Sequence, residues 1–172
     1  MESALLVPVP TAEPVVGPWR ELLDPSAALG VPAHITVMYP FLDPERIDPQ
    51  LVSRLSVMFA AIPAFGFRLT AVRWFQPAVL WLAPEPSQPF HALTLAVMTE
   101  WPALKPYGGA FEETVPHLTV GETETIEQLA KAATAVETAL PLSCEASVVA
   151  LMAGSADARW RTVATLPLGA TG

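Results

Sequence analysis

Two short stretches of the chain share one pattern of residue types that is suited to acid–base chemistry. Both read histidine, apolar residue, threonine, apolar residue, from His34 to Val37 and from His117 to Val120. In an extended strand, side chains two positions apart point to the same face, so each histidine lies roughly 7 Å from its threonine. The apolar residues then point to the other face, as in a strand that packs one face on a core.

Two such motifs could together transfer protons at a phosphate group. Imidazole titrates near neutrality, so one ring can take a proton from an attacking oxygen while the other gives a proton to a departing oxygen. The hydroxyls of Thr36 and Thr119 can donate hydrogen bonds to phosphate oxygens without adding charge. In an in-line displacement at phosphorus the attacking and departing oxygens lie on opposite sides of the phosphorus atom, so one imidazole could serve each side.

The prediction depends on the repetition, because one motif alone is explained as well by a structural histidine. The third histidine, His91, follows a proline at the start of an expected helix, which indicates a surface or packing role. Two histidines leave a zinc site short of ligands, so no metal is expected. Cys144 has no partner and is expected to be a small buried side chain. No Gly-x-Ser-x-Gly elbow or Gly-x-x-x-x-Gly-Lys loop is present.

Composition narrows the classes of partner. The chain has 172 residues with 15% charged and 52% hydrophobic residues, which fits a single domain over residues 1–172. A net charge of −8 with nine basic residues disfavours DNA and long RNA, because such binding requires many Lys and Arg contacts to phosphates. A small cyclic phosphate, a nucleotide or a short RNA end is compatible with this net charge, because a few groups suffice to hold it. We expect a cytoplasmic monomer without a membrane span or signal peptide.

The expected elements follow from hydrophobic periodicity and from turn residues. Strands are expected at residues 4–9, 33–41, 64–72, 73–83, 117–120, 142–151 and 159–166. Helices are expected at residues 13–23, 50–62, 90–101 and 125–140. The first helix should bury Trp19, Leu22 and Leu23, and the last should bury Ile126, Leu129, Ala133, Val136 and Leu140. We expect a hairpin turn near Gln76-Pro77, an irregular connection over residues 105–116, and Gly121 at the end of the second motif strand.

The order of these elements indicates a duplication. It reads β-α-β-α-β-β-α-β-α-β-β, and the motif histidines are 117 − 34 = 83 positions apart, close to half the chain. The predicted fold class is therefore α+β, a bilobal pair of pseudo-symmetric lobes whose antiparallel sheets face a central cleft with helices packed outside. Residues 142–151 and 159–166 are expected to form a last antiparallel pair around residues 154–157.

The repeated motif, half a chain apart in a small α+β protein, resembles that of the 2H phosphoesterase superfamily, in particular its 2′-5′ RNA ligase-like branch. The likeness covers the architecture of the whole chain, but its specific content lies in residues 34–37 and 117–120. The resemblance implies an enzyme without a cofactor, a hydrolase of a ribose 2′,3′-cyclic phosphate or a related diester, with a link to RNA processing. It implies His34 and His117 as acid and base, and Thr36 and Thr119 as phosphate ligands.

Several other residues are candidates for contacts with substrate. Aromatic faces bind nucleobases, and the candidates for stacking are Tyr39, Phe41, Trp81, Tyr107 and Trp160, each of which could instead belong to the core or a wall. Tyr107 lies in a glycine-containing loop before the second motif, and Arg159 could reach a phosphate. We select Tyr39, Tyr107 and Arg159 as substrate-binding residues. The alternative function is a non-catalytic module that binds a nucleotide or a phosphorylated metabolite.

Overall fold

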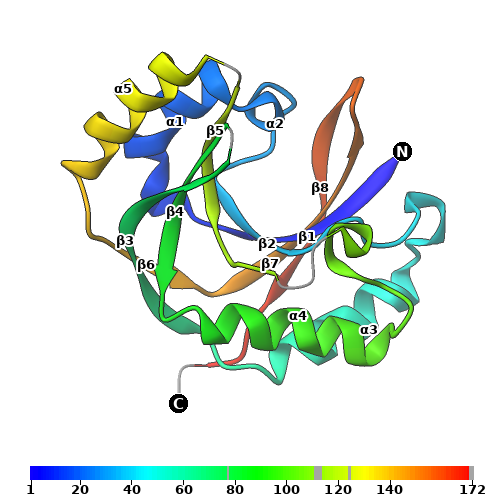
Figure 1. Cartoon of the computed structure of the whole chain (residues 1–172). Helices are drawn as coiled ribbons and strands as arrows, with labels where there is room; N and C mark the ends of the chain where they lie inside the picture. Colours follow the sequence, from blue (N-terminus) through cyan, green and yellow to red (C-terminus); the bar gives the residue numbers. More distant parts are fainter. Residues whose placement is uncertain (77, 111–113, 124, 171–172) are drawn as a thin grey trace.

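The computed structural model describes residues 1–76, 78–110, 114–123 and 125–170, and it has an α+β fold built on two antiparallel sheets (Figure 1). The first sheet has the strand order β2-β1-β7-β8 and the second has the order β5-β4-β3-β6. The strands are β1 (Glu2–Pro8), β2 (His34–Met38), β3 (Phe65–Phe75), β4 (Val79–Glu85), β5 (Leu118–Glu122), β6 (Leu142–Ala146), β7 (Val148–Ser155) and β8 (Ala158–Pro167). The predicted fold class is confirmed.

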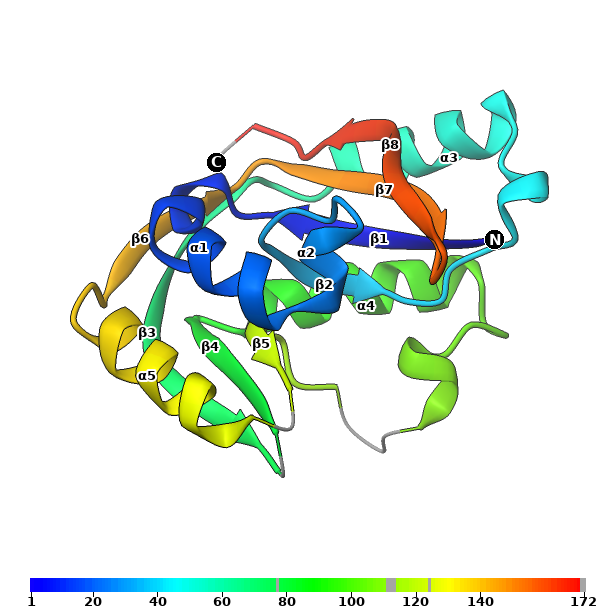
Figure 2. The ribbon, with the colours of Figure 1, turned by 90° about the horizontal axis from the view of Figure 1, so that it is seen from above.

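The helices cover the two sheets in an interleaved way. They are α1 (Glu13–Leu23), α2 (Pro25–Ala28), α3 (Pro49–Ala60), α4 (Gln88–Glu100) and α5 (Ile126–Glu137), with 3-10 turns η1 (Pro10–Ala12), η2 (Pro44–Arg46) and η3 (Pro106–Gly109). Helices α3 and α4 pack on the first sheet, whereas α1 and α5 pack on the second (Figures 1 and 2). Helix α1 therefore precedes β2 but contacts β5, and α4 precedes β5 but contacts β2.

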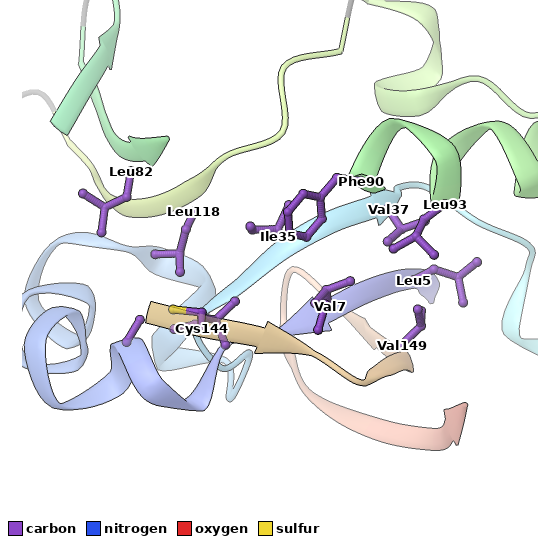
Figure 3. Close-up of a cluster of buried hydrophobic side chains, with 14 of the residues drawn as sticks. Leu5, Val7, Ile35, Val37, Leu82, Phe90, Leu93, Leu118, Cys144 and Val149 are labelled. Atoms are coloured by element: carbon purple, nitrogen blue, oxygen red, sulfur yellow. The ribbon is translucent and has the colours of Figure 1, made fainter. Parts of the chain in front are cut away.

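One hydrophobic core joins the two sheets. Leu5 and Ile35 of the first sheet, Leu82 and Leu118 of the second, and Leu93 of α4 are fully buried in the same cluster. Figure 3 shows these side chains converging from strands that lie far apart in the sequence. Because burying each large aliphatic side chain contributes about 1.5–3 kcal/mol, this shared core accounts for much of the stability.

Helix α3 shows how local sequence and core agree. Asp48 accepts a hydrogen bond from the backbone nitrogen of Leu51 at 2.7 Å, and Pro49 occupies the first turn, where its missing N–H costs nothing. Leu51, Leu55 and Phe59 recur at intervals of four and are all buried. The helix predicted over residues 50–62 is confirmed to within two residues at each end.

The prediction of one strand over residues 142–151 is wrong. The chain forms β6, which pairs with β3 in the second sheet, and then β7, which pairs with β1 and β8 in the first. Ser147 separates the two strands, and the carbonyl of Ser147 accepts a hydrogen bond from the nitrogen of Leu168. Strand β6 alternates and buries Cys144 and Ala146, whereas β7 buries the six consecutive residues 149–154, so the break coincides with a change of pattern that the single-strand prediction overlooked.

Two predicted helix faces are also wrong in part. Leu22 is 76% exposed, and α1 instead buries Val16, Arg20 and Leu23. Ile126 is 47% exposed, and α5 buries Leu129, Ala132 and Val136. In both helices the buried side is set by the strand beneath, which selects one of two overlapping apolar stripes.

Several predicted strand limits shift. The first motif strand ends at Met38 rather than at residue 41, and β3 continues to Phe75, past the predicted limit at residue 72. The hairpin turn between β3 and β4 falls where it was predicted, although Pro77 lies outside the described residues, as do residues 111–113 of the predicted irregular connection. Gly121 lies inside β5, which ends at Glu122.

The described ranges contain no helix that combines the length and the apolar character needed to cross a lipid bilayer. The longest, α4, has 13 residues, whereas a span requires about 20.

Gly121 gives a test of how β5 is packed. A Cβ atom at this position would lie 2.7 Å from Leu23 Cβ and 2.9 Å from Leu129 Cδ2, so Gly121→Ala should lower the free energy of unfolding by about 1–3 kcal/mol. The control is Gly66→Ala in β3, whose Cβ would approach nothing closer than 3.9 Å. Urea denaturation of both variants measures the difference, and equal stabilities would contradict the close packing of α1 and α5 on β5.

Candidate active site

The two motif strands are edge strands of different sheets that lie against each other. Strand β2 pairs with β1 and β5 pairs with β4, each at the edge of its sheet. Residues of β2 and β5 come within 8 Å of each other, Cα to Cα, and both views show the strands side by side (Figures 1 and 2). The fold therefore brings together two motifs that are half a chain apart.

The alternation predicted for each motif is present. Ile35, Val37, Leu118 and Val120 are buried in the core, whereas the histidine and threonine of each motif are half-buried. On the second sheet, Thr119 stands directly opposite Trp81 of β4, so these two side chains share a face. His117 immediately precedes β5 instead of lying within it.

Both histidines make the same hydrogen bond to their own backbone. His34 Nδ1 lies 2.7 Å from the carbonyl oxygen of Pro32, and His117 Nδ1 lies 2.6 Å from that of Val115, in each case two residues earlier. A carbonyl oxygen can only accept, so Nδ1 carries the hydrogen in both rings. The neutral form of each imidazole therefore keeps its lone pair on Nε2, the atom available to exchange a proton.

Burial is the main cause of a lowered pKa at both rings. It lowers the pKa of His34 from 6.5 to about 4, against an opposing contribution from the hydrogen bond to Pro32. Arg20 and His117 lower this pKa further by charge repulsion, and Asp24 raises it. Burial likewise lowers the pKa of His117, opposed by the hydrogen bond to Val115. The influence of His117 on His34 places the two imidazoles within electrostatic range of each other.

An aromatic cluster surrounds His117. Phe75 and Trp81 stack on each other with ring centroids 4.5 Å apart, and both rings approach His117 edge-on at 5.0 and 5.8 Å. Tyr107 lies nearly parallel to the imidazole, with a centroid distance of 6.4 Å. These rings account for the desolvation that lowers the pKa of His117.

Tyr107 links the two motifs. Its hydroxyl is hydrogen-bonded with the side chain of Thr36, while its ring stacks on His117. Its backbone nitrogen donates to the carbonyl of Tyr39, and its φ of 53° places it in the left-handed region. A non-glycine residue at positive φ is uncommon and is held there by its surroundings.

Trp81 carries an unusual polar atom beside the motifs. Its indole nitrogen is buried, and within the part of the chain that the structure describes it has no hydrogen-bond partner. Buried indole N–H groups usually donate to an acceptor. Trp81 is a sequence candidate for stacking on a nucleobase, but the residue is 8% exposed and its ring packs on Phe75, so it forms part of the wall beside His117.

Beside Thr36, the same face of the first sheet is apolar, and we call the surface formed by Leu6 and Ala150 the apolar floor. Leu6 lies opposite Thr36 and Ala150 lies opposite Leu6, so the three side chains share one face across β2, β1 and β7. Tyr39 and Trp160 pack on this floor with ring centroids 6.2 Å apart. Tyr39 also donates a hydrogen bond to Glu2 at 2.9 Å.

The remaining candidates fall in different places. Phe41 is 5% exposed and packs edge-on against Trp101, so it belongs to the core and the stacking role considered for it is wrong. Arg159 is exposed and lies against Gly30, four residues before His34. His91 is exposed and borders a cavity of about 10 Å³ that Thr36 and Tyr107 also line.

Cys144 is buried as predicted, and burial raises the pKa of its thiol. Over residues 1–76, 78–110, 114–123 and 125–170, no three His, Cys, Asp or Glu side chains gather closely enough to hold a metal ion.

Sequence reasoning missed the polar residues behind His34 and the aromatic ring beside His117. Glu13, Arg20 and Asp24 surround the loop that leads into β2, and Phe75 contacts His117. A signal was present for two of them, because Arg20 interrupts the apolar stripe of α1 and Asp24 follows at i+4. Glu13 had no local signal, since its partner lies 20 residues away.

Comparisons with known proteins agree with this geometry. A sequence profile described as the 2′-5′ RNA ligase superfamily matches residues 7–158. No curated protein matches the chain by sequence. Among solved structures, Escherichia coli LigT complexed with 3′-AMP is similar at 19% identity, with a TM-score of 0.58 over 97% of each chain.

Two further solved structures show the same fold. The LigT complex with NADP⁺ has a TM-score of 0.56 at 18% identity, covering 98% of this chain and 97% of the other. The protein TT0787 of Thermus thermophilus has a TM-score of 0.64 at 15% identity, covering 99% of both chains. At these identities the likeness concerns the fold, and the profile match supplies the family.

The lowered pKa of His34 predicts an acid-sensitive stability. Below about pH 6.5 the unfolded chain binds a proton at this imidazole, whereas the folded protein does so only near pH 4, so protonation favours unfolding. The penalty should grow from pH 6.5 to 4 and reach about 1–3 kcal/mol for this half-buried ring.

Urea denaturation between pH 7 and pH 4 measures this effect as the difference between the wild type and His34→Gln. The exposed His91→Gln variant is the control. If His34→Gln and the wild type lose stability in parallel over this range, His34 is not the titrating group.

Proposed function

Because the chain belongs to the 2′-5′ RNA ligase superfamily, we propose that it is a phosphoesterase that hydrolyses a ribose 2′,3′-cyclic phosphate on a nucleotide or a short RNA end. The observation that carries this proposal is the matched pair of imidazoles, each with Nδ1 held by a carbonyl two residues earlier. Two oriented Nε2 atoms within electrostatic range of each other are what a general acid and base require.

The reaction needs no group beyond water and the side chains of the two motifs. One neutral imidazole takes a proton from water as its oxygen attacks phosphorus. The bond from phosphorus to one ribose oxygen breaks, and the second, protonated imidazole gives that oxygen a proton. The product is a ribose phosphomonoester with a free neighbouring hydroxyl. Thr36 and Thr119 donate hydrogen bonds to the non-bridging oxygens, where charge develops.

The surroundings of the motifs support a nucleotide as substrate. The floor formed by Leu6 and Ala150 is apolar and adjoins Thr36, and Tyr39 and Trp160 stand on it. Aromatic faces stack on nucleobases with little sequence preference, so we assign Tyr39 to the base. LigT, which shares the fold, has been solved with 3′-AMP and with NADP⁺.

Tyr107 and Arg159 complete the proposed binding residues. Tyr107 orients the hydroxyl of Thr36 and the ring of His117, because it contacts both. Arg159 lies near the loop before β2 and supplies a cation for a phosphate beyond the reacting one. The net charge of −8 favours a small ligand over a long polyanion.

Turnover of nucleoside 2′,3′-cyclic phosphates is the first test. The chelator-treated wild type should hydrolyse members of a four-base panel, and His34→Ala and His117→Ala should each lower kcat/KM by about 10²–10⁴. Arg54→Ala is the control, because Arg54 is exposed, pairs with Glu100 and lies outside both motifs.

Two outcomes of this assay would contradict the proposal. Activity that disappears with chelator and returns with a divalent cation would show that catalysis requires a metal, which contradicts the proposed metal-independent mechanism. Stoichiometric binding of the cyclic nucleotides without product would instead favour the non-catalytic module.

The pH dependence gives an independent test. A base that must be neutral and an acid that must be protonated give a bell-shaped profile of kcat/KM. Burial lowers the pKa of both imidazoles, so both limbs of the profile should have midpoints below pH 6.5. The acidic limb should have its midpoint near pH 4, the pKa of His34. A plateau that extends above pH 8 would be incompatible with these two groups as the acid–base pair.

A further inference from the structure

The three residues that precede His34 are each held by a separate hydrogen bond. The carbonyl of Val31 accepts from Arg20 Nη2 at 3.2 Å, and the carbonyl of Pro32 accepts from His34 Nδ1 at 2.7 Å. The nitrogen of Ala33 donates to Glu13 Oε1 at 2.6 Å. Two of the three partners, Glu13 and Arg20, come from helix α1.

Arg20 is itself fixed by a buried ion pair. Its Nε and Nη2 donate to Asp24 Oδ2 at 3.0 and 2.9 Å, and the two residues are 2% and 7% exposed. Asp24 Oδ1 accepts from the backbone nitrogen of Ser26, the second residue of α2. Charges buried this deeply tolerate little movement, because breaking such a pair leaves an uncompensated buried charge.

We propose that Glu13 and the Arg20–Asp24 ion pair are positioning residues for His34, and that they hold the carbonyl of Pro32 where it fixes the tautomer and orientation of the imidazole. The proposal rests on the proposed function, in which His34 Nε2 exchanges a proton at the substrate. It assigns this helix a role in the reaction without any contact with substrate.

A carbonyl can orient an imidazole only as accurately as it is held itself. Pro32 lies between the two residues that α1 anchors, so movement at either anchor moves the hydrogen bond of His34. A displacement of about 1 Å at a reacting group can cost about 10²-fold in rate.

The same ion pair also sets the electrostatic environment of the ring. The charged groups that face His34 are Arg20 and Asp24 on the α1 side and His117 on the side of the second motif. Arg20 lowers the pKa of His34, whereas Asp24 raises it. Removing the charge of Arg20 should therefore raise the pKa of His34, and removing the charge of Asp24 should lower it, although both changes break the same ion pair.

The two histidines are thus held by different means. His34 is supported from behind by charged and polar side chains, whereas His117 is packed among Phe75, Trp81 and Tyr107. Substitutions at Glu13, Arg20 and Asp24 should therefore change the tautomer or the pKa of His34 and leave the pKa of His117 nearly unchanged. The signals of His117 are thus an internal control in every sample.

The experiment is an NMR titration of the imidazole ¹⁵N and ¹³C signals in the full chain. Arg20→Met should raise the pKa of His34, and Asp24→Asn should lower it. Arg54→Met is the matched control, since it removes an exposed ion pair with Glu100 on α3 and α4. Shifts of His34 in the same direction in both variants, or no shift in either, would overturn the electrostatic part of the proposal.

The tautomer of His34 tests the positioning part. Wild type should show Nδ1–H, and Glu13→Ala should give a mixture of tautomers with kcat about 10- to 100-fold lower and KM nearly unchanged. Glu13→Gln keeps an acceptor for the nitrogen of Ala33 and should restore both. A single Nδ1–H tautomer in Glu13→Ala, with kcat unchanged, would overturn it.

If Arg20→Met does not fold, Arg20→Lys keeps the charge but loses the two-pronged contact with Asp24, and it should mix the tautomers without raising the pKa of His34. The NMR readouts do not require turnover. An inactive wild type with the expected tautomer and opposite shifts would therefore refute the proposed hydrolysis and leave the positioning intact.

Discussion

The site depends on one constraint, which is that two edge strands from different sheets lie against each other without pairing. Strands β2 and β5 are each paired on one side only, within their own sheet, and residues of the two strands lie close together. The edge of β2 is further satisfied by Thr94 of α4, whose hydroxyl donates to the carbonyl of Val37 at 2.9 Å. The contact between β2 and β5 brings the two motifs, which belong to different sheets, beside each other.

Helix α1 connects the two halves of this centre. Its polar side chains hold the loop before His34, and its Leu23 packs on β5 at Gly121, two residues after Thr119. The helix thus positions one motif by hydrogen bonds and the other by close packing. Its buried Arg20 is costly in isolation, and such a group is retained where its partners are all in place.

The chemical character of the centre is compatible with the proposed phosphoesterase activity in a protein of net charge −8. In the proposed reaction the motifs contribute two imidazoles and two hydroxyl groups, and the hydroxyl groups would contact the phosphate oxygens without adding charge. Burial, mainly through aromatic and apolar neighbours, lowers the pKa of both imidazoles. A centre of this kind gains its strength from desolvated, oriented dipoles instead of from a field of positive charge, and this suits a small substrate.

Repetition and periodicity in the sequence predicted the fold class and the pairing of the two motifs, and the resemblance carried by the repeated motif indicated the family. Strand alternation is local, so the half-buried state of His34, Thr36, His117 and Thr119 could be predicted from their immediate neighbours. The same holds for α3, where the cap and the apolar spacing agree.

Only the tertiary structure decided which sheet each strand joins, which face of α1 and α5 is buried, and what stands behind each histidine. The sheet that each strand beside Ser147 joins, and the contact between Glu13 and Ala33, depend on segments that are distant in sequence, so no local pattern predicts them. Arg20 shows the reason most clearly. A charge on an apolar stripe can be read in the sequence, but whether it is exposed, paired or directed at a particular carbonyl is set by the partners that folding brings to it.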